Sequence, residues 1–482
     1  MKIHIKKNIS KKNLFTIIPV FKDQKLSASD IPTATKNIKT LEKEFKKESG
    51  EKKYLPDNSQ IVLISLGESK KLKSAKIREF GATCVKMAGS QKANEFNIFL
   101  PEQSLNFAQE LVEGIILSNF NAGKFQTGKN KEKAEKKLIK EVNLIVKKET
   151  KILSDKVKKG QILAESVNET RDMVNAPNNY ANANTLAAEA KKIAKENGYK
   201  ISIYDKKQLQ KMKMGAILAV NAGSTIGAKL VVMEYKPKGA TNKKPIMVVG
   251  KGVTFDSGGY NLKPTGAITD MKKDMAGAAT VFGLFKVLKK LGIKKHVIGI
   301  TPLTENLVSS NAYKVDDIIT AYNGKTIEVL NTDAEGRLIL ADALSYGVKK
   351  YKPEAVIDLA TLTGAILVAL GDRYAGVFGN NKDLSQQILK AGEETDELCW
   401  ELPIHEDFKK RTEGSLADLK NVTNTGLAGS STAAAFLEHF VDKAKWAHID
   451  IAGVAWSKFP KSFDNQHSTG FGVRLLTKYL EG

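Results

Sequence analysis

Two carboxylates and an arginine stand at alternate positions in the segment 331–338 (NTDAEGRL), namely Asp333, Glu335 and Arg337. The alternating, β-branched segment 325–330 predicts a strand before them, and the segment 338–344 predicts a helix after them. In extended chain these three side chains would point to one side, at the carboxyl end of a strand. Hard anionic ligands beside a fixed cation suit a divalent metal and an anion. A polar turn with an acidic helix cap is the competing interpretation.

A second group of candidate residues follows the predicted strand 245–250. The segment 250–264 (GKGVTFDSGGYNLKP) carries Lys251, Asp256 and Lys263, and Asp274 follows where a helix of small residues begins. The glycines let the backbone pass close to a ligand, but neither phosphate-binding glycine pattern is present. For Asp274 the competing role is that of a helix N-cap.

The two segments together supply four carboxylates, which cannot share a site without cations because like charges raise one another's pKa. Two divalent ions about 3.5–4 Å apart would resolve the repulsion and would ionise a bound water near neutral pH. A lysine between the ions would be a neutral nitrogen ligand, whereas a lysine beside them would stay charged and polarise a carbonyl. The spacing leaves open which role Lys251 and Lys263 each take.

The length of 482 residues favours two domains in an α/β fold. We expect a small N-terminal α/β domain over residues 1–150, a charged linker helix over 151–172, and a larger catalytic domain over 173–482. Strands alternate with helices in the last part, which predicts a mostly parallel central sheet covered by helices on both faces. The predicted strands are 2–6, 13–21, 61–66, 141–146, 200–204, 229–235, 245–250, 296–301, 325–330, 354–359 and 446–451, and the predicted helices are 37–48, 102–119, 182–197, 276–290, 337–348 and 430–443.

The chain is strongly basic, with a formal net charge of +23. Residues 1–150 hold 30 basic and 17 acidic side chains, and the segment 124–140 has seven lysines. A polyanion partner is one interpretation of such a surplus. However, only six of the 76 basic residues are arginines, and aromatic residues do not alternate with the lysines. A solvated lysine-rich surface is therefore the favoured interpretation.

Composition and termini point to a cytoplasmic protein without a membrane partner. The two cysteines, Cys84 and Cys399, have no metal-ligand spacing, and a reducing compartment fits them. The first six residues alternate as a strand does, unlike a signal peptide. The most apolar run, 359–370, is shorter than the roughly 20 residues that span a bilayer.

The segment 331–338 and the loop from Lys251 to Lys263 resemble the leucyl aminopeptidase family (cytosol aminopeptidases) of bacterial type. The resemblance covers roughly residues 165–482 and extends to segments 358–365, 428–430, 448–453 and 469–474. Residues 1–150 resemble the family in size and layout only.

The resemblance implies a site with two divalent metal ions, Mn²⁺ or Zn²⁺, because an oxygen-rich ligand set with one amine suits either. Asp256 and Glu335 would bridge the ions, and Lys263 would polarise the scissile carbonyl. Arg337 would hold a bicarbonate ion that acts as the base, in agreement with the fact that arginine itself stays protonated. The metal ligands that the resemblance implies are Lys251, Asp256, Asp274, Asp333 and Glu335.

The implied reaction is hydrolysis of the N-terminal peptide bond of peptides with a free N-terminus, with release of leucine-like residues. The resemblance also implies a homohexamer. An additional or separate role as a DNA-binding regulator or recombination accessory, through the basic N-terminal domain, is the alternative. The first side chain would enter an apolar pocket, although core packing is the competing role for its residues. The implied pocket residues are Met271, Thr361, Gly364, Ala452 and Ala455.

Overall fold

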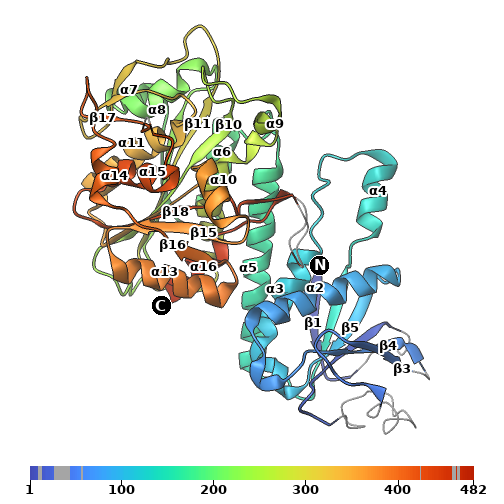
Figure 1. Cartoon of the computed structure of the whole chain (residues 1–482). Helices are drawn as coiled ribbons and strands as arrows, with labels where there is room; N and C mark the ends of the chain where they lie inside the picture. The colour runs from blue at the N-terminus through green and yellow to red at the C-terminus, as the bar shows by residue number, and fades with distance from the viewer. Residues whose placement is uncertain (9–13, 26–43, 56–57, 424, 459–462, 464–466) are drawn as a thin grey trace. The chain divides into compact units, whose positions relative to one another are not determined.

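The computed structural model describes residues 1–8, 14–25, 44–55, 58–423, 425–458, 463 and 467–482 (Figure 1). The chain forms two compact units. The first unit comprises Met1–Asn168 with Phe459–Asn465, and the second comprises Glu169–Lys458 with Gln466–Gly482. Helix α5, Lys151–Asn175, contributes to both units.

The first unit is built on a six-stranded sheet in the order β1-β6-β5-β2-β4-β3. Every neighbouring pair is parallel except β3 with β4. Buried Ile18, Leu63 and Phe99 belong to one of its apolar clusters. Its elements are β1 Lys2–Lys6, β2 Thr16–Val20, β3 Lys52–Leu55, β4 Asn58–Ser65, η2 Ser69–Lys71, α2 Ser74–Ser90, β5 Glu95–Phe99, η3 Glu102–Phe107, α3 Ala108–Ser118, α4 Gly128–Lys136 and β6 Glu141–Ile145.

Two predictions for the first unit have different outcomes. The helix expected over 37–48 is wrong for residues 45–48, which are not helical, and residues 37–43 lie outside the described residues. The lysine-rich segment forms the short helix α4, and none of its residues is buried. Lys131 and Glu135 form a loose ion pair on it at 4.0 Å, as expected for a solvated helix surface.

The second unit contains a nine-stranded sheet in the order β16-β15-β18-β14-β9-β11-β8-β7, with β10 paired to β11. Its central strands β18, β14, β9 and β11 are parallel, and antiparallel pairs lie toward both edges, so the predicted mostly parallel sheet is confirmed. The strands are β7 Lys200–Tyr204, β8 Lys229–Tyr235, β9 Ile246–Gly250, β10 Gly252–Asp256, β11 Val297–Asn306, β14 Ala355–Ala360, β15 Ala375–Gly379, β16 Cys399–Glu401 and β18 Lys445–Asp450.

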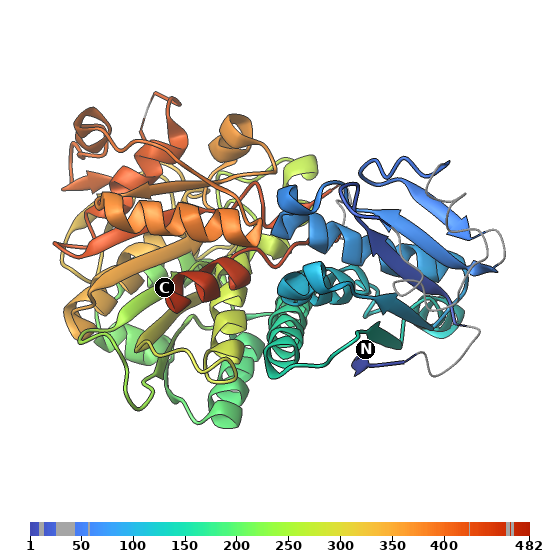
Figure 2. The ribbon, with the colours of Figure 1, turned by 90° about the horizontal axis from the view of Figure 1, so that it is seen from below.

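Helices cover both faces of this sheet (Figures 1 and 2), as predicted. Gly299 of β11 faces α10, because a Cβ there would lie 2.5 Å from the Phe285 ring. On the opposite face, the Ile300 side chain reaches α11, where a Cβ on Gly347 would lie 2.8 Å from it. The helical segments are α6 Ala183–Asn197, α7 Lys206–Lys211, α8 Gly215–Val220, η4 Asn221–Gly223, α9 Thr265–Ile268, η5 Met271–Met275, α10 Ala276–Leu288, α11 Glu335–Tyr351, α12 Gly364–Leu370, α13 Lys382–Thr395, α14 Glu406–Lys410, α15 Gly429–Glu438 and α16 Val473–Glu481.

The strand predicted over 325–330 is shorter and lies elsewhere. It is β13, Thr326–Glu328, and it belongs to a separate three-stranded sheet with β12, Ile318–Thr320, and β17, Leu419–Lys420. The backbone N–H groups of Leu330 and Asn331 donate to Asn421 Oδ1 at 2.8 and 3.3 Å, and not to a neighbouring strand. A last pair of short strands is β19, Trp456–Ser457, and β20, His467–Ser468.

Across the described residues, no helix combines the length and apolar character that crossing a bilayer requires.

Candidate metal centre

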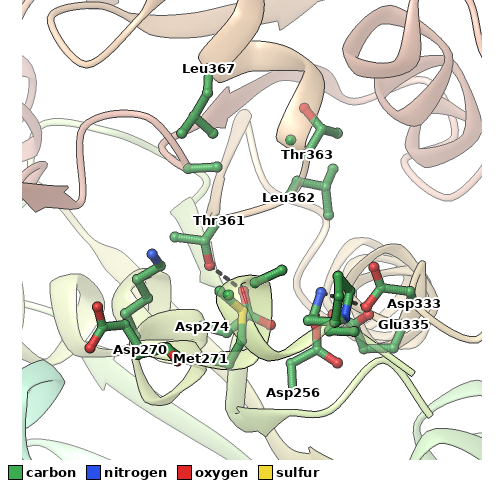
Figure 3. Close-up of a pocket in the computed structure, with 18 of the residues that line it drawn as sticks. Asp256, Asp270, Met271, Asp274, Asp333, Glu335, Thr361, Leu362, Thr363 and Leu367 are labelled. Carbon is green, nitrogen blue, oxygen red and sulfur yellow. Dashed lines mark hydrogen bonds and ion pairs between the residues drawn. The ribbon is translucent and has the colours of Figure 1, made fainter. Parts of the chain in front are cut away.

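Carboxylates from three segments of the second unit meet at the carboxyl ends of its parallel strands (Figure 3). Oxygen atoms of Asp256, Asp333 and Glu335 all lie within 4.8 Å of one another. Asp256 ends β10, and Glu335 is the first residue of α11. Asp274, in η5, joins the group through Lys251, whose Nζ lies 2.8 Å from Asp274 Oδ2 and 2.8 Å from Glu335 Oε1.

Two lysines neutralise this group, and each of them pairs with two of the four carboxylates. While Lys251 contacts Asp274 and Glu335, Lys263 Nζ lies 2.9 Å from Asp256 Oδ2 and 2.5 Å from Asp333 Oδ1. Lys251 also donates to the carbonyl of Thr361 at 2.8 Å and is only 3% exposed, whereas Lys263 is 15% exposed. The two lysines therefore differ in access to solvent, with Lys263 the more accessible.

The residues that carry the lysines and carboxylates approach closely because glycines and side-chain bonds allow it. A Cβ on Gly258, which has a φ of +88°, would lie 2.9 Å from Asp333 Oδ1, and a Cβ on Gly336 would lie 2.6 Å from Lys251 Nζ. Asn261 and Thr332 join the two loops, since the N–H of each residue donates to the side chain of the other at 2.9 and 2.8 Å. Glycine is therefore needed at both approach points.

Burial dominates the electrostatics of the group. Burial and the neighbouring Asp256 carboxylate raise the pKa of Glu335 to about 8. Burial likewise raises the pKa of Asp274 to about 6, although Lys251 opposes the shift. Burial alone would lower the pKa of Lys251, but the carboxylates of Asp274 and Glu335 outweigh it and raise that pKa. The protein thus concentrates negative charge that only cations make tolerable.

The residues present fit a pair of divalent cations. The buried Oε2 atom of Glu335 has no hydrogen-bond partner among the described residues, so one carboxylate oxygen is left for a ligand. The other potential ligand atoms are carboxylate oxygens and the amines of Lys251 and Lys263, one at each end of the group. This set of ligand atoms suits zinc or manganese. Both helix-cap interpretations fail, because the N-cap residues of α10 and α11 are Met275 and Ala334 and neither is acidic.

The expected alternation of Asp333, Glu335 and Arg337 along extended chain is wrong. Helix α11 begins at Glu335, so Arg337 lies in its first turn and not on a strand. An acidic first residue is favourable at a helix N-terminus, where the backbone N–H groups are unpaired. Asp333 and Glu335 still converge because a turn, and not a strand, separates them.

Arg337 is buried beside the centre but is not part of the cavity wall described below. Its Nη1 donates to the carbonyl of Asn421 at 2.6 Å, and its buried Nε has no hydrogen-bond partner in the described part of the chain. Burial lowers the pKa of Arg337 to about 10, so the guanidinium stays charged near neutral pH. The side chain is therefore a fixed buried cation with a free donor.

A cavity of about 590 Å³ opens over the carboxylates. Its wall includes all five residues expected to bind metal, together with Lys263. Four of the five expected pocket positions, Met271, Thr361, Gly364 and Ala452, also line it. Ala455 does not; its side chain is buried, in keeping with the core-packing interpretation. Figure 3 shows Leu362 and Leu367 on the side of the cavity away from the carboxylates.

Asn306 is a residue of this site that the sequence analysis did not identify. It ends β11, and its Nδ2 donates to Asp256 Oδ1 at 2.8 Å and to the carbonyl of Thr332 at 3.0 Å. The predicted strand stopped at residue 301, whereas β11 continues to Asn306. A polar residue at the true carboxyl end of that strand was the available signal.

Replacing Asn306 by alanine is expected to weaken metal binding about 10- to 100-fold, because residues that orient a metal ligand have effects of that size. Metal titration with a competing chelator would measure it. Asn380→Ala is a matched control, since Asn380 also joins two segments, through Ala444 and Trp446, outside the cavity wall. Equal metal affinity in wild type and Asn306→Ala would contradict the positioning role.

Comparison with known proteins agrees with this geometry. Residues 168–477 match the model of the cytosol aminopeptidase family, catalytic domain, and residues 17–129 match its N-terminal domain. A probable cytosol aminopeptidase of Chloroherpeton thalassium is 42% identical over 438 residues, covering 88% of this chain and 83% of that protein. One of Rickettsia bellii is 40% identical over 450 residues, covering 90% and 86%.

The solved structures include a similar enzyme. The bottromycin maturation enzyme BotP in complex with Mn matches with a TM-score of 0.83 and 28% identity, over 97% of this chain and 98% of that one. The family model, the relatives and the buried carboxylate group point the same way. The chain belongs to the cytosol aminopeptidase family and is a metal-dependent aminopeptidase.

Proposed function

We propose that this enzyme releases the first residue of peptides with a free N-terminus, using two divalent ions held by Lys251, Asp256, Asp274, Asp333 and Glu335. The observation that carries the proposal is the pairing of four carboxylates with two lysines at one end of a cavity. Asp256 pairs with Lys263, and one of its carboxylate oxygens lies within 4.8 Å of oxygens of Asp333 and Glu335, which supports a role for Asp256 and Glu335 as ligands of both ions.

When bound, the two ions supply Lewis acidity for the substrate and an ionised water near neutral pH. The cationic side chains of the enzyme are proposed to have separate roles. Lys263 lines the cavity and is the more exposed lysine, which supports a role for its ammonium in donating to the scissile carbonyl oxygen as negative charge develops there. Lys251 is enclosed by Asp274, Glu335 and the Thr361 carbonyl, which supports a role as a metal ligand.

Arg337 is proposed to hold bicarbonate as the general base. Its guanidinium stays protonated and cannot accept a proton itself. Its buried Nε has no hydrogen-bond partner among the described residues, which supports the binding of an anion beside it. The guanidinium would therefore orient a base without acting as one.

The substrate side chain is proposed to be leucine-like. Met271, Leu367 and Ala452 give the wall of the same cavity apolar surface. Burying a leucine side chain against such a wall is worth about 1.5–3 kcal/mol. Manganese is the proposed ion, since the similar enzyme BotP is solved in complex with Mn, with zinc as the other candidate.

Chelation and dialysis are expected to reduce hydrolysis of leucine p-nitroanilide to background, and Mn²⁺ or Zn²⁺ to restore it. The physical reason is that the carboxylates alone cannot ionise water near neutral pH. Ion binding to the folded state should also raise the melting temperature in a concentration-dependent way. Full activity in protein shown to be metal-free by elemental analysis would overturn the proposal.

The homohexamer, the cytoplasmic location and the DNA-binding role stay predictions.

A further inference from the structure

Two lysines on the cavity wall stand apart from the metal-binding group. Lys273 belongs to η5, between Lys272 and Asp274, and Lys458 follows β19. Neither ammonium forms a hydrogen bond or an ion pair with any residue that the structure describes, in contrast to Lys251 and Lys263. The cavity thus contains positive charge that the metal-binding carboxylates do not neutralise directly.

The Lys273 side chain is held in place by an aromatic ring. Its Nζ lies 5.6 Å from the centroid of Trp456, and Lys272 Nζ lies 5.7 Å from the same centroid. Lys272 also donates to the carbonyl of Asn175 at 2.8 Å, whereas Lys273 has no such acceptor among the residues that the structure describes. Lys273 is half-buried. A partly buried cation without an ion-pair partner in the described residues is unfavourable, and an anion in the cavity would relieve that cost.

The charge of the cavity favours that anion. Four metal-binding carboxylates and two divalent ions cancel in formal charge, and the cavity wall has one further carboxylate, Asp270. Against it stand Lys273 and Lys458, with Lys263 at the carboxylate group. A cleft lined by a surplus of one sign attracts ligands of the other sign.

The position of these lysines indicates which part of a substrate they would meet. Lys273 shares η5 with Met271, one of the residues expected to contact the first side chain. Lys458 lines the same cavity as Met271 and Ala452. A glutamate side chain matches this combination, since its methylenes suit the apolar wall and its carboxylate suits an ammonium.

We propose that Lys273 and Lys458 form a carboxylate-recognition site for the side chain of an acidic first residue, so that the enzyme releases N-terminal glutamate and aspartate as well as leucine-like residues. This inference rests on the proposed aminopeptidase activity. It extends the substrate class of that site from apolar side chains to acidic ones.

The test compares glutamyl, glutaminyl and leucyl p-nitroanilides on the full-length, metal-loaded enzyme. Glutamine has nearly the shape of glutamate without the charge, so the ratio of the two kcat/KM values isolates the ion pair. We expect glutamate to be preferred over glutamine by about tenfold at low salt. The preference should shrink as salt increases, since the Debye length is only about 10 Å at 0.1 M.

Methionine substitutions then test whether the two lysines cause the preference for glutamate over glutamine. Lys273→Met and Lys458→Met should each lower the glutamate-to-glutamine ratio several-fold. Lys458 is exposed, so its replacement keeps the test available if Lys273→Met fails to fold. Lys349→Met is the matched control, because Lys349 lies over the ring of Tyr322 at 5.5 Å and is not part of the cavity wall. That control should leave the ratio unchanged.

A second set of substrates checks the position of the carboxylate. The dipeptides leucyl-glutamate and leucyl-glutamine place the same pair of side chains after the scissile bond. If the lysine substitutions change this second ratio and not the first, the inference is overturned. It is also overturned if leucine is released while glutamate is no better than glutamine. Release of none of these residues by metal-loaded enzyme would instead refute the proposed aminopeptidase activity.

Discussion

Replacing Glu335 by glutamine is expected to lower kcat/KM for leucine p-nitroanilide by at least about 10³-fold. The change keeps the shape of the side chain and removes a carboxylate whose Oε2 is buried without a partner in the described structure. Its other oxygen, Oε1, lies 2.8 Å from Lys251 Nζ, and glutamine can accept a hydrogen bond there as well. The loss should therefore come from the missing metal ligand, measured as activity and as metal content.

Folding is expected to survive this substitution. Since burial raises the pKa of Glu335 to about 8, its ionised form is unfavourable in the metal-free protein at neutral pH. Metal-free Glu335→Gln should melt no lower than metal-free wild type. Glu397→Gln is a matched control, as Glu397 is a buried glutamate that accepts from the N–H of Leu475 at 2.7 Å. Comparable activity in Glu335→Gln and Glu397→Gln would remove Glu335 from the site.

Replacing Lys263 by alanine is the second large effect, an expected fall in kcat of about 10²- to 10³-fold with metal content retained. The physical reason is the loss of a charged donor that lines the cavity and that we propose faces the developing oxyanion. Elemental analysis together with kcat would distinguish a loss of metal binding from a loss of carbonyl polarisation.

Lys251→Ala is the comparison for that experiment. Lys251 is enclosed between Asp274 and Glu335, so its removal should lower metal content before it lowers anything else. If Lys263→Ala lost its metal and Lys251→Ala kept it, the roles assigned to the two lysines would be interchanged.

The sequence predicted which residues meet at the carboxylate group better than it predicted their local geometry. Asp256 ends a parallel strand, and Lys251 and Thr361 each follow the end of one, so strand order alone brings them to one edge of the sheet. The alternation argument for Asp333 and Glu335 failed because it assumed extended backbone where α11 begins. A hydrophobic pattern locates an element but not the residue at which it starts.

Other features could not be predicted because their signals are tertiary. Strand β15 contains Gly376 and Gly379, and glycine is depleted in strands. The structure explains both glycines, since a Cβ on Gly376 would lie 2.4 Å from Ile366 and a Cβ on Gly379 would lie 2.7 Å from the Trp446 carbonyl. The reciprocal bonds of Asn261 and Thr332 likewise join residues distant in sequence.

Anomalous scattering from crystals grown with Mn²⁺ tests the central claim most directly. We expect two peaks per chain, about 3.5–4 Å apart, with Asp256 and Glu335 between them. Lys263 should then be released from Asp256 and Asp333, which it contacts in the structure described above. A single peak, or none, with both lysines still joining the same carboxylates at saturating Mn²⁺, would contradict the account.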